Sequence, residues 1–283
     1  VIIAIGPRLG EITTSGYKLI KSPMPEQKLV HVHSGAEELG VVFRPMLAIN
    51  ASPLNFVNTI KNIKFKNLHW ANETATARLE FLEWSTPKKS KDKIDLAQIV
   101  TWITNNTPND TIVTNGAGNY SAWVHRYYRY RGFGTGIGPT SGSMGYGTPA
   151  AISAKILYPN RVVIAFAGDG CFLMNGQELA TAVQYNLSII IIIVNNGMYG
   201  TIRMHQEREY PGNVFGTNLN NPRFAALARA YGAIGKSVKN IAEFKEVFNT
   251  AKSATKPTLI ELKTSPEAIS PSTTISKIRN YKK

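Results

Sequence analysis

Short apolar runs alternate with amphipathic stretches along most of this chain. Runs that are apolar at every position are typical of strands in a parallel sheet covered on both faces, whereas apolar residues three or four apart are typical of helices. The strands predicted in this way are residues 111–114, 161–167, 187–194 and 258–262. The helices predicted around them are residues 95–103, 148–157, 175–184, 222–231 and 242–251, with Asn175 as the N-cap of the third. The alternation predicts an α/β fold with a doubly wound, mostly parallel sheet.

The first part of the chain shows the same alternation on a smaller scale. Strands are predicted at residues 1–5 and 28–33, a short helix at 36–39 and a second helix that begins at Pro53. Together these elements are part of an α/β unit that is too small to bury its own sheet. Because Val1 already lies inside an apolar run, we expect the chain to be the C-terminal portion of a longer polypeptide.

Between these two regions the pattern becomes polar. A helix is predicted over residues 68–83, and the stretch TPKKSKDK after it has the composition of a linker. We therefore expect a partial domain over residues 1–66, a linker over 67–93 and a complete α/β domain over 94–283.

The net charge of +14 suggests a nucleic-acid partner, but the basic residues are scattered along the chain rather than gathered into a motif. No nucleic-acid partner is therefore expected. No apolar run reaches the roughly 18 residues that a membrane span requires, so no membrane association is expected either. The only cysteine, Cys171, has no partner for an internal disulfide, which agrees with a cytoplasmic location.

Polar residues follow two consecutive predicted strands. Asp169 lies between Gly168 and Gly170 after the first, and Asn195 and Asn196 follow the second. If these strands are neighbours, about 4.8 Å apart, their carboxyl ends open into one crevice. Carboxylate and amide oxygens suit Mg²⁺, and glycine N–H groups can approach phosphate oxygens closely. The layout predicts a Mg²⁺-bridged diphosphate site; the alternative interpretation is two unrelated tight turns.

The same residues carry a resemblance to a known family. Gly-Asp-Gly followed by the Asn-Asn pair resembles the diphosphate-binding motif of the thiamine-diphosphate-dependent enzymes, and PTSGSMGYGTPA resembles their Gly-x-Met-Gly segment. In the acetolactate synthase-like branch, IAIGPRLGE and HVHSGAEELG resemble the end of the central domain, and residues 94–283 resemble the diphosphate-binding domain. The resemblance implies thiamine diphosphate and Mg²⁺ as cofactors. It also implies decarboxylation or carboligation of a small-molecule 2-oxo acid.

The resemblance also assigns individual residues. Metal ligation falls to the side chains of Asp169 and Asn196 and to the backbone carbonyl of Met198. The residues assigned to the cofactor are Gly118, Asn119, Gly142, Ser143, Met144, Gly168, Gly170, Cys171, Met198 and Tyr199. Among them, the Gly142 carbonyl is expected to accept from the pyrimidine ring, and Met144 is expected to support the bent cofactor.

No catalytic side chain is assigned, because the family's activating glutamate belongs to an N-terminal pyrimidine-binding domain. That domain is expected elsewhere in the same chain or in a partner chain, and a homodimer or tetramer is expected because the family's active sites form between subunits. The chain on its own, without that domain, is therefore expected to be catalytically inactive. The alternative is a non-catalytic remnant that binds thiamine diphosphate and Mg²⁺ without turnover.

Two departures from the family pattern bear on the substrate and on flavin. Gly-Thr-Ile-Arg-Met-His follows the Asn-Asn-Gly-Met-Tyr segment where acetolactate synthases have another sequence, so the donor and acceptor are not assigned. The flavin-binding synthases carry aspartates at their counterpart of HVHSGAEE, where this chain has histidine and serine. The sequence therefore argues against FAD.

Overall fold

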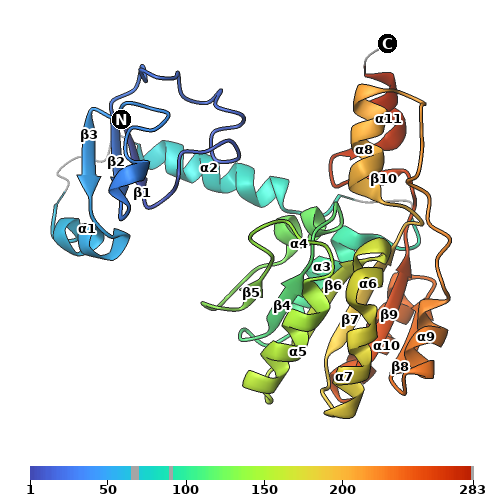
Figure 1. Ribbon diagram of the computed structural model, residues 1–283. Coiled ribbons are helices and arrows are strands. Elements are labelled where there is room, and N and C mark those ends of the chain that lie inside the picture. Colours follow the sequence, from blue (N-terminus) through green and yellow to red (C-terminus); the bar gives the residue numbers. More distant parts are fainter. Residues whose placement is uncertain (65–69, 89–91, 282–283) are drawn as a thin grey trace. The chain divides into compact units, whose positions relative to one another are not determined.

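The computed structural model describes residues 1–64, 70–88 and 92–281, and the chain divides into two compact units, Val1–Thr76 and Ala77–Lys283 (Figure 1). The boundary between the units lies inside α2 (Ala71–Trp84). The start predicted for this helix, and the domain boundary predicted at residue 66, lie outside the described residues. The limits proposed for the central domain, the linker and the larger domain stay predictions.

The first unit contains a parallel three-stranded sheet in the order β1 (Ile2–Ile5), β2 (Leu29–His33) and β3 (Leu47–Asn50). Its helical elements are the 3₁₀ turn η1 (Ala36–Glu38) and α1 (Pro53–Ile60). The side-chain oxygen of Ser52 accepts a hydrogen bond from the Asn55 N–H and so caps α1. Strand β3 was not predicted because its run is short and mostly exposed.

The second unit is built on a six-stranded sheet in the order β5-β4-β6-β7-β9-β8, with every pair parallel (Figure 1). The strands are β4 (Ile112–Asn115), β5 (Gly136–Ile137), β6 (Val163–Gly168), β7 (Ile190–Asn195), β8 (Ile234–Val238) and β9 (Thr258–Lys263). The expected doubly wound α/β sheet is confirmed.

Helices cover both faces of this sheet. They are α3 (Leu96–Asn105), α4 (Ser121–Tyr127), α5 (Gly147–Leu157), α6 (Asp169–Asn175), the 3₁₀ turn η2 (Gly176–Glu178), α7 (Leu179–Gln184), α9 (Phe224–Ala230) and α10 (Ile241–Lys252). Helix α8 (Gly200–Glu209) lies apart from the sheet faces (Figure 1). The chain ends with the hairpin of β10 (Ala268–Ser270) and β11 (Thr273–Thr274), followed by α11 (Ile275–Asn280).

The apolar run of β7 shows why a strand between two layers is hydrophobic at every position. Ile190 and Ile192 pack into the core cluster that includes α3, α4 and α10. Ile191 and Ile193 pack into the opposite cluster, which includes α5, α7 and α9. Successive side chains point to opposite faces of a strand, so a strand buried on both faces needs an unbroken apolar sequence.

Several elements differ from the prediction. The segment after β6 turns directly into α6 at Asp169, so Asn175 is the last residue of this helix; it stands at the predicted N-cap position, before η2, but its side chain makes no capping hydrogen bond. The Asn175 amide donates to the Gly145 carbonyl at 3.4 Å, a long-range contact that local pattern does not reveal. Strands β5 and β8 and helices α4 and α8 were also not predicted; β5 is only two residues long, and β8 and α8 are partly polar.

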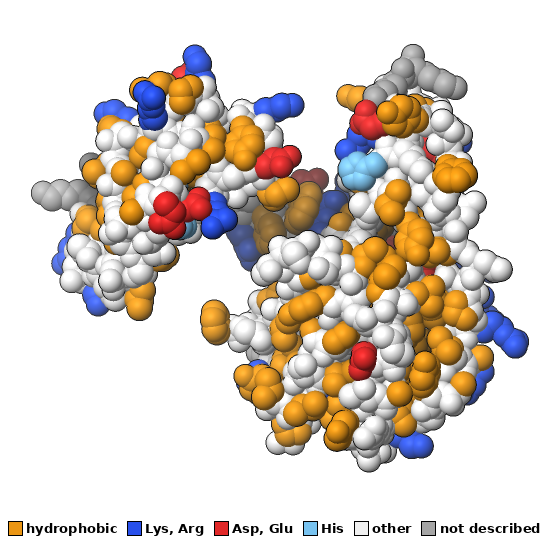
Figure 2. Space-filling view, viewed as in Figure 1, with side chains coloured by type: hydrophobic (Ala, Val, Ile, Leu, Met, Phe, Trp, Pro, Cys, Tyr) orange, Lys and Arg blue, Asp and Glu red, His pale blue; other side chains and the backbone are white. Residues whose placement is uncertain are grey.

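The surface agrees with the scattered charge pattern. On the face of the second unit seen in Figure 2, Lys and Arg side chains are dispersed, with apolar side chains between them. Among the helices that the structure describes, none is both long enough and apolar enough to span a bilayer.

Candidate active site

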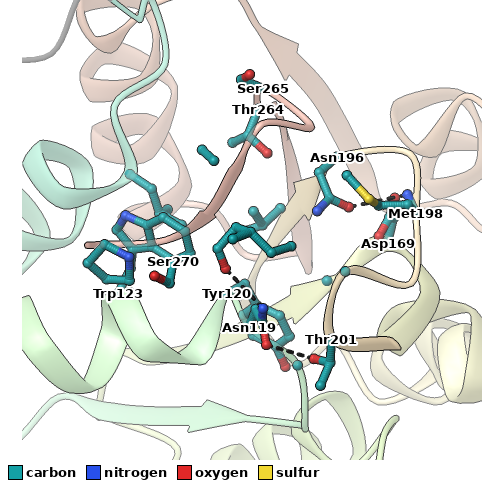
Figure 3. Close-up of a pocket in the computed structure, with 18 of the residues that line it drawn as sticks. Asn119, Tyr120, Trp123, Asp169, Asn196, Met198, Thr201, Thr264, Ser265 and Ser270 are labelled. Atoms are coloured by element: carbon teal, nitrogen blue, oxygen red, sulfur yellow. Dashed lines mark hydrogen bonds between the residues drawn. The ribbon is translucent and has the colours of Figure 1, made fainter. Parts of the chain in front are cut away.

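A cavity of about 790 Å³ lies in the second unit at the carboxyl ends of the parallel strands (Figure 3). Its walls come from the segments that follow β4, β5, β6, β7 and β9 and from the start of α3 with the residues before it. Open parallel sheets place ligand sites at this edge, because the loops after the strands converge there. The register supports the convergence predicted from sequence: β6 and β7 are neighbours, and Gly168 lies opposite Val194.

The cavity brings together nearly all of the residues singled out from the sequence. Those that line it are Gly118, Asn119, Gly142, Met144, Gly168, Asp169, Gly170, Cys171, Asn196, Met198 and Tyr199. Ser143 is not part of the lining. Its hydroxyl lies 2.8 Å from that of Ser141, and its carbonyl accepts from the Ala117 N–H.

Asp169 is the first residue of α6 and is only 2% exposed. Its Oδ1 accepts from the Gly170 N–H at 2.9 Å, and its Oδ2 accepts from the Gly197 N–H at 2.8 Å and from Asn221 Nδ2 at 2.7 Å. Burial raises the pKa of the Asp169 carboxyl, while the hydrogen bond from Asn221 acts in the opposite direction. No Lys, Arg or His pairs with this carboxylate in the described part of the chain. The site therefore holds a buried acidic group with no cationic partner of its own.

The two asparagines at the end of β7, Asn195 as its last residue and Asn196 directly after it, have different environments. Asn196 lines the cavity, and the one hydrogen bond that its Oδ1 accepts from the described residues is long, 3.3 Å, from the Met198 N–H. Asn195 points into the protein, where its Nδ2 donates to Glu261 and its Oδ1 accepts from Gly197 and Asn221. The structure thus separates an asparagine that faces the cavity from one that is held inside.

Met198 forms an isolated antiparallel bridge with Asn218. The hydrogen bonds of this bridge use the Gly197 carbonyl and the Tyr199 N–H, so they do not use the Met198 carbonyl. Asp169, Asn196 and Met198 can therefore offer a carboxylate, an amide and a peptide oxygen to one cation. No cluster of three or more His, Cys, Asp or Glu occurs within the described ranges. The donor set consists of hard oxygens, which suit Mg²⁺ or Ca²⁺ rather than zinc.

Glycine is required at two positions on the cavity wall. A Cβ on Gly170 would lie 2.6 Å from the Tyr199 ring, and Gly118 has φ +150° with the Tyr120 ring 2.9 Å from an added Cβ. Larger residues would push these aromatic rings out of place. The backbone of both loops therefore runs close against the rings that line the cavity.

Tyr120 lines the cavity but was not identified from the sequence. Its hydroxyl accepts from the Gly116 N–H at 2.9 Å and lies 3.4 Å from the Cys171 sulfur, so it joins the loops after β4 and β6. Burial is the main reason that the pKa of the Tyr120 phenol is raised well above its ordinary value. The only sequence signal was its place directly after the Gly-Ala-Gly-Asn turn.

Asn119 lines the cavity, yet its side chain is engaged within the protein. Its Nδ2 donates to the Ile269 carbonyl at 3.0 Å, and its Oδ1 accepts from Thr201 at 2.8 Å. These bonds attach α8 and the β10 hairpin to the loop after β4.

The wall of the cavity that follows β9 was not identified from the sequence either. It includes Thr264, Ser265 and Ser270 from the segment after β9. Figure 3 shows Trp123 and Ser270 on one side of the cavity and Asp169, Asn196 and Met198 on the other.

Comparison with known proteins agrees with this geometry. Residues 116–262 match the family described as "Thiamine pyrophosphate enzyme, C-terminal TPP binding domain". The chain is 28% identical over 255 residues to the acetolactate synthase large subunit of Buchnera aphidicola subsp. Schizaphis graminum, covering 87% of this chain and 44% of that protein. It is 31% identical over 242 residues to that of Lactococcus lactis subsp. lactis, covering 82% of this chain and 40% of the relative.

A solved structure is similar as well. The thiamine diphosphate-dependent 4-hydroxybenzoylformate decarboxylase of Rhodococcus jostii RHA1 superposes with a TM-score of 0.69 at 26% sequence identity. The match covers 85% of this chain and 45% of that one. The chain spans about half the length of the curated relatives that it matches, or slightly less.

Proposed function

Because this chain belongs to the thiamine pyrophosphate enzyme family, we propose that it supplies the diphosphate-binding half of an enzyme that decarboxylates a 2-oxo acid or joins the product to an acceptor. The observation that carries the proposal is the meeting of Asp169 and Asn196, from the ends of neighbouring strands, in one cavity. The similarity to acetolactate synthase large subunits supports the reaction class.

The residues present fit a bound Mg²⁺. A buried carboxylate without a cationic partner is unfavourable, and a divalent cation would compensate its charge. Asp169, Asn196 and the Met198 carbonyl would hold this ion, which would in turn bind the diphosphate. The Gly170 and Cys171 segment, at the start of α6, would approach the phosphate oxygens through its backbone.

The remaining wall residues would position the cofactor. Thiamine diphosphate, when bound, supplies the nucleophilic carbon and the electron sink for breaking the bond next to the 2-oxo group. Met144 packs against the hydrophobic core below the cavity, so it can support the cofactor from beneath. Gly142, at φ +66°, would direct its carbonyl to the pyrimidine ring.

None of the described side chains is assigned to proton transfer at the reacting carbon. We propose that a pyrimidine-binding domain, in the same polypeptide or in a partner subunit of a homodimer or tetramer, supplies the activating glutamate. FAD is not part of the proposal.

Withdrawal of metal is expected to abolish cofactor binding, because the carboxylate and the diphosphate would then repel each other. Isothermal calorimetry of thiamine diphosphate with the full chain should show binding in Mg²⁺ and none measurable in excess chelator. Binding that is equal under the two conditions would contradict the metal bridge.

A measurement of turnover distinguishes the proposed enzyme from a non-catalytic remnant that only binds the cofactor. Decarboxylation of a 2-oxo acid that appears once a pyrimidine-binding half is supplied supports the enzyme. Cofactor binding that never leads to turnover in such a mixture favours the non-catalytic alternative.

A further inference from the structure

Asn221 lies outside the cavity lining, just before α9, yet it contacts two of the strand-end residues. Its Nδ2 donates to Asp169 Oδ2 at 2.7 Å and to Asn195 Oδ1 at 2.9 Å. Asp169 follows β6, Asn195 is the last residue of β7, and they are 52 and 26 residues away from Asn221 in sequence. A single amide group therefore joins the ends of β6 and β7.

Glu261 and the Gly197 N–H together fix the orientation of the Asn195 amide, and Asn195 in turn fixes that of Asn221. Glu261 lies on β9, is 3% exposed, and accepts from Asn195 Nδ2 at 2.8 Å. The Gly197 N–H can only donate and contacts Asn195 Oδ1 at 3.2 Å, so the oxygen of Asn195 faces Gly197 and Asn221 and its NH₂ group faces Glu261. Asn221 must then direct its own NH₂ group to Asn195 and Asp169. The hydrogen bonds thus connect the two buried carboxylates, and the Asn221 NH₂ group donates in both directions, to Asp169 and, through Asn195, toward Glu261.

The oxygen of the Asn221 amide supports a functional interpretation. Its Oδ1 is buried and has no hydrogen-bond partner among the described residues. Leaving a buried acceptor unpaired is unfavourable, so the stability of the fold alone does not explain this orientation of the Asn221 amide. The orientation that satisfies Asp169 and Asn195 is kept although it leaves the oxygen unpaired.

We propose that Asn221, oriented by Glu261 through Asn195, is a positioning residue that holds Asp169 for the metal without touching metal or cofactor. Asn221 and Gly197 engage Asp169 Oδ2, while Oδ1 accepts from the neighbouring Gly170 N–H and, among the described side chains, from none, so it keeps acceptor capacity. This inference rests on the proposed function, since it assigns a role to a neighbour of the expected metal ligand. Partners that orient metal ligands in this way typically affect metal affinity by about 10–100-fold.

The test is a Mg²⁺ titration of the full chain at saturating thiamine diphosphate, in which binding is measured by calorimetry. Asn221→Leu has nearly the same size and is expected to raise the Mg²⁺ concentration at half-saturation by about 10–100-fold. Glu261→Gln is expected to raise it severalfold, because a glutamine amide can offer Asn195 either its oxygen or its NH₂ group, so one of the two contacts that fix Asn195 is lost. The matched control is Asn220→Leu; Asn220 is the exposed neighbouring asparagine and is expected to behave like the wild type.

Circular dichroism of the metal-free variants gives the folded fraction, by which each binding curve is corrected. The inference is supported if the Asn221→Leu shift persists after correction and the effects of Asn221→Leu and Glu261→Gln are not additive in the double variant. It is overturned if the corrected half-saturation of Asn221→Leu equals that of Asn220→Leu. A wild-type chain that binds thiamine diphosphate without regard to Mg²⁺ would instead refute the proposed function, and this inference with it.

Discussion

Asp169→Ala is expected to lower the affinity for thiamine diphosphate in Mg²⁺ by more than about 100-fold, since even an outer partner of a metal ligand affects affinity by 10–100-fold. The substitution removes the only carboxylate in the expected donor set. It also removes the acceptor for the Gly197 N–H and for Asn221 Nδ2. Leaving these donors unpaired costs about 1–3 kcal/mol, which is offset in part because an uncompensated buried charge is lost as well. The second unit should therefore stay folded, as circular dichroism would show.

A surface aspartate provides the control for this experiment. Asp110 is about half exposed, pairs with Arg161 and does not line the cavity. Asp110→Ala should bind the cofactor with wild-type affinity in the same calorimetric titration. If Asp169→Ala did so as well, the assignment of the metal site to this strand end would be wrong.

The second large effect concerns stability and centres on Glu207. This carboxylate of α8 is fully buried and accepts from Arg279 of α11 through two nitrogens, at 2.6 and 2.9 Å. Arg203 and the Gly212 N–H complete its hydrogen bonds, and α8 and α11 lie side by side (Figure 1). Glu207 is buried but the Arg279 side chain is 39% exposed, and Arg203 remains, so Arg279→Leu should lower the free energy of unfolding by less than the loss of a fully buried partner would. Urea unfolding of the full chain measures this loss.

The same ion pair predicts a dependence on pH. The hydrogen bond from Arg279 is the main reason that the pKa of Glu207 falls from 4.5 to about 2. A lowered pKa in the folded state contributes stability that is fully present above pH 4.5 and is lost as the pH falls toward 2. Arg279→Leu should weaken this loss between pH 4.5 and 2, whereas Arg208→Leu, at an exposed position of α8, should keep the wild-type profile. An unchanged profile in Arg279→Leu would show that the pair does not stabilise the fold.

Local pattern was sufficient for the core of the fold and for one side of the site. The apolar runs of β6 and β7 identify strands buried on both faces, and Asp169 and Asn196 follow them directly. A residue at the end of a parallel strand has its position determined by the strand, because all carboxyl ends open at one edge. The approximate place of these side chains could therefore be predicted without coordinates.

Helices and strands whose sequences lack a clear hydrophobic periodicity were predicted poorly. Helix α8 is largely polar, so its sequence carries no apolar stripe, and its attachment depends on the ion pair between Glu207 and Arg279. Asn175 was predicted to cap a helix with its side chain because asparagine favours that position. In the structure α6 already begins at Asp169, directly after β6, and the Asn175 side chain makes no capping hydrogen bond. In both places long-range contacts override local preference.

The amino-acid sequence by itself determined the layered α/β architecture and the polar strand ends, since both depend on residues close together in the chain. Only the tertiary structure decided which polar groups share a hydrogen bond. It brought Tyr120 against Cys171, Asn221 against Asp169 and Glu207 against Arg279. The reason is physical: hydrogen bonds and ion pairs depend on ångström-scale separation and orientation, and for partners tens of residues apart these are set by how helices and strands pack.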